Sequence, residues 1–297
     1  MDTFPLRHFV LALTVVAVWG TNFVIIKIGL DHLPPLFFGA ARFLLASLPC
    51  LFLPRPKVPI GQLAAYGLLI GSAQFGFLLI AMRGEISPGL ASLVLQMQVF
   101  FTIGLAVLLT GERVRGFQYA ALGIAVAGIC IIAANTDATT SALGLGLVIL
   151  AAASWAGGNI VAKRSGVTDM LPFVVWGSLF SAPPLFALSF LIEGFDAIRL
   201  GIATAEVATW AALIWQAVGN TLFGYAVWGW LLSRHPAALV TPMALLVPVF
   251  GMTTSAIVLQ EALPAWKLLA AALVISGLAI GLVYPRWSNR LALRKGR

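Results

Sequence analysis

Long apolar runs follow one another along almost the whole chain, and short polar or proline-containing stretches separate them. Most windows of about 20 residues are apolar and long enough to cross a bilayer as a helix. Prolines such as Pro34, Pro35 and Pro264 fall at the junctions, where helix breakers are expected. The pattern predicts ten membrane-spanning helices, at about residues 8–29, 35–53, 61–82, 88–109, 116–134, 142–162, 172–192, 207–231, 236–258 and 265–284.

The second half of the chain repeats polar and aromatic positions of the first. VWGTNFVIIK (18–27) and SWAGGNIVAK (154–163) both carry Trp, Asn and Lys, with eight residues from Trp to Lys. Further pairs stand 148 or 149 residues apart: Phe75-Gly76-Phe77 with Phe223-Gly224-Tyr225, Pro88 with Pro236, Glu112 with Glu261, and Gly128 with Gly277. We therefore expect an all-α integral membrane protein whose ten transmembrane helices form two five-helix repeats, residues 1–137 and 138–297.

The number of helices in each repeat sets their relative orientation. Because five is odd, the second repeat enters the bilayer from the opposite side, so the repeats are inverted. Inverted repeats with a site near the midplane are typical of secondary transporters.

Composition agrees with a membrane protein. Hydrophobic residues make up 61% of the chain and charged residues 9%, compared with roughly 25% charged residues in soluble domains. The net charge of +8 does not indicate nucleic acid, because nearly all charges lie at span ends. The lipid bilayer is the expected partner of the apolar helix surfaces.

The distribution of Lys and Arg predicts the orientation. With a cytoplasmic N-terminus, thirteen of the 18 basic residues lie on the cytoplasmic side: Arg7, Arg55, Lys57, Arg113, Arg115, Lys163, Arg164, Arg234, Arg286, Arg290, Arg294, Lys295 and Arg297. The other five are Lys27, Arg42, Arg83, Arg199 and Lys267. This asymmetry follows the positive-inside rule and predicts that both termini are cytoplasmic.

Polar side chains inside the spans are the candidates for function, because an unpartnered polar group is costly in a bilayer. The richest row lies in the eighth span, where Gln216, Asn220, Gly224 and Trp228 recur every four residues and Tyr225 flanks them. The row favours a lined cavity. The alternative is hydrogen bonding between helices, which contributes about 0.6 kcal/mol on average in membranes.

All ten acidic residues map to span ends or loops. Glu112 and Glu261 are nearest to the membrane, and each closes a helix where we expect water and an ion pair, with Arg113, Arg115 or Lys267. Without an embedded carboxylate for a proton, we expect downhill transport. The amide and aromatic groups favour a small zwitterionic or neutral solute, whose carboxylate could meet a broken-helix dipole, Lys27 or Lys163. Snorkelling to the interface is the alternative for both lysines.

Other classes of site find little support in the sequence. Cys50 and Cys130 lie inside apolar runs, which favours packing over a disulfide or a metal pair. We expect no metal, cofactor or catalytic residue. Small residues in spans five and ten, such as Gly123 with Ala127 and Gly277 with Gly281, predict close packing of these helices against each other or in a homodimer.

VWGTNFVIIK, SPGLASLVLQMQVFFTIGLAVLLTGERV (87–114), SWAGGNIVAK and LVPVFG (246–251) resemble the drug/metabolite transporter superfamily, and within it the EamA-type exporters of amino acids and their metabolites. The resemblance implies ten helices, the bacterial inner membrane and a central cavity lined by spans one, three, four, six, eight and nine. It points to these binding residues: Trp19, Asn22, Gln74, Gln96, Trp155, Asn159, Asn220, Tyr225 and Trp228. The small-multidrug relatives carry a glutamate in their first span, and this chain has none there.

Two alternatives stay open. One is a carrier of other cargo, such as drugs or phosphorylated sugars. A phosphate cargo calls for several embedded basic residues, and only Arg42 approaches that description. The other is a membrane enzyme or scaffold, although no embedded nucleophile–base or paired-Asp arrangement is visible.

Overall fold

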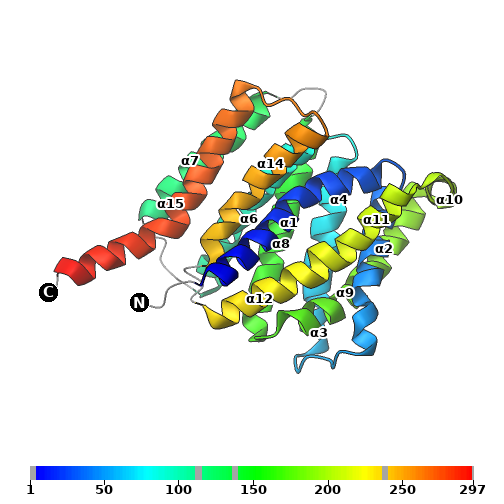
Figure 1. Cartoon of the computed structure of the whole chain (residues 1–297), viewed down its shortest axis with the longest axis horizontal. Coiled ribbons are helices and arrows are strands. Elements are labelled where there is room, and N and C mark those ends of the chain that lie inside the picture. Colours follow the sequence, from blue (N-terminus) through cyan, green and yellow to red (C-terminus); the bar gives the residue numbers. More distant parts are fainter. Residues whose placement is uncertain (1–4, 111–115, 136–139, 236–239, 296–297) are drawn as a thin grey trace.

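The computed structural model describes residues 5–110, 116–135, 140–235 and 240–295, with the backbone alone beyond residue 281. Figure 1 shows a bundle of helices. The first half contains α1 (Leu6–Leu30), α2 (Pro35–Ser47), η1 (Leu48–Leu51), α3 (Ile60–Tyr66), η2 (Gly67–Gln74), α4 (Phe75–Met82), α5 (Pro88–Val94), η3 (Leu95–Met97), α6 (Gln98–Thr110) and α7 (Gly116–Ala134). The second half contains α8 (Ala142–Ser165), α9 (Met170–Leu188), η4 (Ser189–Glu193), α10 (Phe195–Thr204), α11 (Val207–Trp215), η5 (Gln216–Phe223), α12 (Gly224–Arg234), η6 (Thr241–Leu246), α14 (Val247–Val258) and α15 (Ala265–Lys295).

Several of these elements join into longer apolar segments. Within the described residues, six segments are long and apolar enough to cross a membrane: Leu6–Leu30, Ile60–Met82, Pro88–Leu109, Gly116–Ala134, Ala142–Ser165 and Met170–Glu193. A seventh is obtained if the bent pair Phe195–Thr204 and Val207–Leu232 is one span. Pro35–Leu51, Met243–Val258 and Ala265–Gly281 are shorter apolar helices. The chain is thus an all-helical, multi-pass membrane protein, and the count of ten spans stays a prediction.

Local sequence accounts for where several helices begin and end. α2 and α5 begin at Pro35 and Pro88, a position where the missing proline N–H costs nothing. The hydroxyl of Ser141 caps α8 by accepting a hydrogen bond from the N–H of Gly144 at 3.0 Å. α8 ends at Gly166, whose positive φ of 67° suits glycine.

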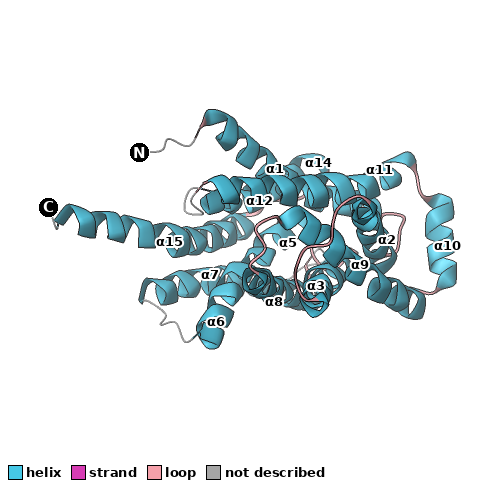
Figure 2. Ribbon diagram, turned by 90° about the horizontal axis from the view of Figure 1, so that it is seen from below, coloured by secondary structure: helices cyan, strands magenta, loops and turns pink. Residues whose placement is uncertain are grey.

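The connection between α9 and α11 differs from the expected loop. Residues Phe195–Thr204 form α10, which meets the following helical segment at 108°. Figure 2 shows α10 at one edge of the molecule, lying across the direction of the other helices. Ile198 and Gly201 are buried, whereas Phe195 and Leu200 are exposed. The pattern of apolar runs does not predict this helix, because ten residues are too few to span a bilayer.

Helices α7 and α15 pack against each other at one side of the bundle (Figure 1). A side chain at Gly277 would lie 2.6 Å from the carbonyl oxygen of Ala121, and one at Gly128 would lie 2.9 Å from that of Ala270. The small residues therefore allow close contact between these two helices, as one of the two alternatives predicted. Both cysteines are free, and Cys130 on α7 is exposed rather than packed, contrary to expectation.

Two irregular segments occur at equivalent places in the two halves. η2 and η5 are π-helical, and each has eight residues. They begin at Gly67 and Gln216, positions that stand 149 apart. In η5 the hydroxyl of Thr221 donates a hydrogen bond of 2.9 Å to the carbonyl of Gln216, five residues earlier. Such π segments widen a helix locally and are frequent at functional sites.

Candidate functional site

A small cavity lies in the interior of the bundle, between α1, η2 with α4, α5 with η3, α8, η5 with α12, and α14. Its volume of about 50 Å³ has room for a few water molecules. Seven of the nine residues predicted to bind cargo line it: Trp19, Asn22, Gln74, Gln96, Trp155, Asn220 and Tyr225. The structure thus brings these seven together, whereas binding of cargo by them stays a prediction.

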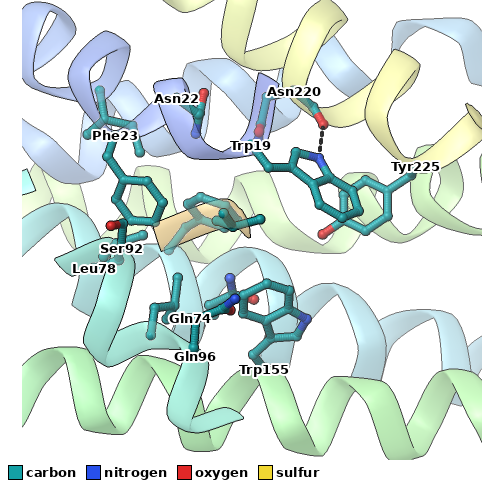
Figure 3. Close-up of a pocket in the computed structure, with 14 residues that line it drawn as sticks. Trp19, Asn22, Phe23, Gln74, Leu78, Ser92, Gln96, Trp155, Asn220 and Tyr225 are labelled. Atoms are coloured by element: carbon teal, nitrogen blue, oxygen red, sulfur yellow. Dashed lines mark hydrogen bonds between the residues drawn. The ribbon is translucent and has the colours of Figure 1, made fainter. Parts of the chain in front are cut away.

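Trp19 forms one wall of this cavity. Its indole Nε1 donates a hydrogen bond to the backbone carbonyl of Asn220 at 3.2 Å, drawn as a dashed line in Figure 3. Its rings pack on Tyr225 and Trp228, with ring centroids 5.8 Å and 5.2 Å away. The indole can lie this close to α12 because Gly224 has no side chain; a Cβ there would collide with Nε1. The glycine in the repeated Phe-Gly-Tyr motif therefore positions Trp19.

Amide groups supply most of the polar lining. Gln216, just outside the cavity, donates from Nε2 to Oδ1 of Asn22 at 2.6 Å, and Gln96 donates from Nε2 to the carbonyl of Ala244 at 3.0 Å. The side-chain oxygen of Gln74 is buried and accepts no hydrogen bond from the described residues. Figure 3 shows Gln74, Gln96 and Trp155 on the side of the cavity opposite Trp19. No charged side chain of the described residues lines this cavity, whose polar groups are amide, indole, phenol and hydroxyl groups.

Two predicted binding residues do not line the cavity. Asn159 donates from Nδ2 to the side-chain oxygens of Gln98 at 2.9 Å and Thr102 at 3.3 Å, on the neighbouring α6. Trp228 lies behind Trp19 as part of its aromatic support. These contacts correspond to the helix–helix alternative rather than to direct contact with the cavity.

The two lysines considered for a cargo carboxylate lie in the last turns of their helices. Lys27 pairs with Asp31 at 3.0 Å, and its side chain is 36% exposed. Lys163 is exposed in the last turn of α8. Neither lines the cavity.

Arg42 is a basic residue whose surroundings the sequence does not predict. Its side chain is buried in α2. The guanidinium lies 3.8 Å from the ring centre of Phe75, a residue that lines the central cavity. The sequence shows Arg42 as a charge inside an apolar run, but it does not show which residues surround this charge in space.

Glu261 contradicts the expectation of a hydrated carboxylate. Its side chain is only 9% exposed and pairs at 3.0 Å with Lys267, which is 3% exposed. The predicted pairing with Lys267 is confirmed. The carboxylate also accepts hydrogen bonds from the hydroxyls of Ser87 and Ser255 and from the N–H of Gly89, at the start of α5. Its proposed counterpart Glu112 lies outside the described residues, as do Arg113 and Arg115.

The surroundings of Glu261 act on its pKa in opposite directions. Burial raises the pKa of this carboxyl, but the hydrogen bonds from Ser255, Ser87 and Lys267 and the charge of Lys267 outweigh burial, so the pKa is lower than its ordinary value. Glu261 is therefore a buried structural anion at the N-terminus of α5, where the helix dipole also favours a negative charge.

Comparison with known proteins places this helical bundle in a family. The EamA-like transporter family matches the sequence twice, over residues 6–134 and 142–283. The chain belongs to this family. An EamA-like transporter is a membrane carrier and not an enzyme.

Relatives and a solved structure extend along nearly the whole EamA-like chain. It is 40% identical to a protein of Escherichia coli (strain K12) named "Probable amino-acid metabolite efflux pump", over 97% of this chain and 98% of that protein. A protein of Streptantibioticus cattleyicolor named "Probable terminal-alkyne amino-acid exporter" is 28% identical over 91% of each chain. One crystal structure has a TM-score of 0.61 at 17% identity, covering 94% of this chain and 98% of its own, and therefore supports the fold alone.

Proposed function

We propose that this protein exports amino acids or amino-acid metabolites across the bacterial inner membrane by alternating access. The observation that carries the proposal is the 40% identity, over nearly the full length of both chains, to a protein named as an amino-acid metabolite efflux pump. The central cavity is compatible with this cargo, since amide, indole and phenol groups line it and no charged side chain does so among the described residues. Both features favour a small polar solute.

The proposed architecture is ten transmembrane helices in two inverted five-helix repeats. Three observations support it. The shorter apolar helices coincide with expected spans two, nine and ten. The π segments η2 and η5 occupy equivalent positions. Gly128 and Gly277, which are also equivalent, each lie against the helix of the other.

We further propose that both termini face the cytoplasm. The thirteen-to-five division of basic residues supports this orientation. α1 begins and α15 ends at the same end of the bundle in Figure 1, as an even number of spans requires. A homodimer through α7 and α15 stays a prediction. The glycine faces of these two helices contact each other, so a second copy could bind only to their outward faces. Cross-linking at the exposed Leu122 of α7 tests this dimer.

Transport of an amino acid requires this cavity to change shape. At about 50 Å³ it accommodates only a few water molecules, so cargo enters after the surrounding helices separate on one side. Rocking of one half against the other then exposes the site to the opposite side. Among the described residues, no carboxylate that could carry a proton lines the cavity. This supports transport down the cargo's own gradient.

Efflux of radiolabelled L-amino acids from proteoliposomes tests the proposal, with equal pH on both sides and then with an imposed pH gradient. We expect efflux that does not respond to the gradient, and Asn220→Leu should slow it on the order of tenfold through loss of polar contacts. Leu222→Ala, outside the cavity lining, is the matched control. Proton-driven accumulation would contradict downhill transport, and absence of amino-acid efflux would contradict the proposed cargo.

A further inference from the structure

Arg42 is a buried cation without an anionic partner among the described residues. Its side chain is 1% exposed, and Nη2 donates its one described hydrogen bond, to the hydroxyl of Thr221 at 2.9 Å. Nε and Nη1 are buried and find no acceptor in the part of the chain that the structure describes. The described ion pairs, Lys27–Asp31 and Lys267–Glu261, do not include it. A buried charge is costly unless a counter-charge and hydrogen bonds compensate it, so this guanidinium calls for an anion.

The fold does not require a charge at this position. The Arg42 guanidinium packs against the rings of Phe75 and Phe43, whose centres lie 3.8 Å and 4.9 Å from its Cζ. An apolar side chain of similar length would fill that space without the desolvation cost. If the two halves are aligned through Pro35 and Pro172, Leu179 stands where Arg42 stands, so the second half has a leucine at the corresponding site. The arginine is thus better explained by binding than by packing.

A second, smaller cavity surrounds the guanidinium and adjoins the central one. It has a volume of about 10 Å³, room for about one water molecule. Arg42, Thr221 and the hydroxyl-bearing Ser178 line it. Phe75 and Tyr225 line both cavities and form the partition between them. A rotation of the Phe75 ring about its side-chain bonds would join the two cavities into one elongated site.

We propose that Arg42 binds the carboxylate of the cargo, so that the transported compounds carry a free carboxylate next to an amine. This inference rests on the proposed function and names the chemical group that the carrier recognises. Charge-assisted hydrogen bonds from a guanidinium to a carboxylate are about twice as strong as neutral ones. The unpartnered side-chain oxygen of Gln74, next to Phe75 in the chain and in the central cavity, is the acceptor for the cargo's ammonium group.

The experiment compares amino acids with their amides in proteoliposomes of the full chain. Each radiolabelled L-amino acid that the wild type exports is competed with the unlabelled acid and with its amide, which keeps the amine and side chain but lacks the carboxylate. We expect the amide to compete at least about tenfold more weakly in the wild type, since the guanidinium then remains unpaired. Arg42→Gln should remove this preference, so that acid and amide compete equally, and Arg42→Lys should keep part of it. Arg83→Gln, an exposed basic residue at the end of α4, is the matched control.

The outcomes separate the two proposals. Equal competition by acid and amide in the wild type would refute the role of Arg42 while leaving amino-acid export intact, and this measurement does not depend on whether a variant folds. An Arg42→Gln variant that is folded by size-exclusion chromatography and still prefers the acid at least tenfold would also refute it. Failure of the wild type to export any amino acid would refute the proposed function and the inference with it.

Discussion

Two lysine–carboxylate pairs of equal length allow the effect of burial to be measured within one molecule. Lys267–Glu261 and Lys27–Asp31 both have an N–O distance of 3.0 Å. The side chains of the first pair are 3% and 9% exposed, whereas those of the second are 36% and 52% exposed. Glu261→Gln and Asp31→Asn each replace one carboxylate by an amide of nearly the same shape; Glu261→Gln also weakens the hydrogen bonds that the carboxylate accepts from Ser87, Ser255 and Gly89.

The expected losses of stability differ about tenfold between the two pairs. Breaking a buried pair leaves an uncompensated charge, here Lys267, and costs about 3–5 kcal/mol of the free energy of unfolding. Loss of an exposed pair four residues apart on a helix costs about 0.3–0.5 kcal/mol. At roughly 2 °C per kcal/mol for a chain of this size, Glu261→Gln should lower Tm by roughly 6–10 °C and Asp31→Asn by roughly 1 °C.

Thermal unfolding in detergent checks this prediction. The double variant Glu261→Gln, Lys267→Met removes both charges and should recover much of the loss, because no buried charge is then left alone. A Tm for Glu261→Gln within about 1 °C of that for Asp31→Asn would refute the reasoning that burial decides the strength of the pair.

The pH dependence of Tm gives an independent check on the same carboxylate. Since the folded-state pKa of Glu261 lies below its ordinary value of 4.5, its contribution to stability is fully present above that pH. The contribution is lost as pH falls through the folded-state pKa. Glu261→Gln cannot titrate, so its Tm should change less than that of the wild type on acidification. Parallel curves for the two proteins would contradict the shift.

Three further predictions concern close packing and orientation. Gly224→Ala should displace the Trp19 indole and, with the fold retained, reduce efflux from proteoliposomes on the order of tenfold. Unchanged efflux would show that Trp19 does not shape the transport path of the cargo. Gly277→Ala should destabilise the contact between α7 and α15 by about 1–3 kcal/mol. Gly123→Ala, whose added Cβ has no described atom within 4 Å, should be neutral or slightly stabilising in the same Tm measurement, because alanine favours a helix. Thr168→Cys, in the exposed connection after α8, should react with an impermeant thiol reagent from the cytoplasmic side only; labelling from outside intact cells would reverse the topology.

The positions of the helices follow from the sequence more closely than their irregularities do. Bilayer thickness and the prolines determine where apolar runs begin and end, so α1 and α8 lie within a few residues of the expected spans. The short helix α10 and the π segments leave no such signal, because they depend on contacts with other helices. Gly71 of η2, for example, lies directly against the side chain of Ser181 on α9.

The sequence predicts part of the candidate site, as it predicts part of the fold. Residues repeated in both halves converge on the cavity because equivalent helices surround it, which explains why Trp19 and Trp155 both line it. A spacing of four residues advances by about 40° beyond a full helical turn, so a row of such positions rotates away from the face where it began. Trp228, two steps beyond the cavity-lining Asn220, has in this way moved behind Trp19. The importance of Arg42 depends on which residues surround it in space, and a single sequence does not contain that information.

The hydrogen bond between Gln96 and the carbonyl of Ala244 joins residues 148 positions apart, the same separation that relates Pro88 to Pro236. If the halves are related by a two-fold axis, two equivalent residues can touch only on that axis. A point on the axis is the one place that does not move when the halves exchange their conformations. The bond would then lie where the two halves turn about each other, and its loss should change the rates of inward and outward opening by the same factor, which leaves the balance between the two states unchanged.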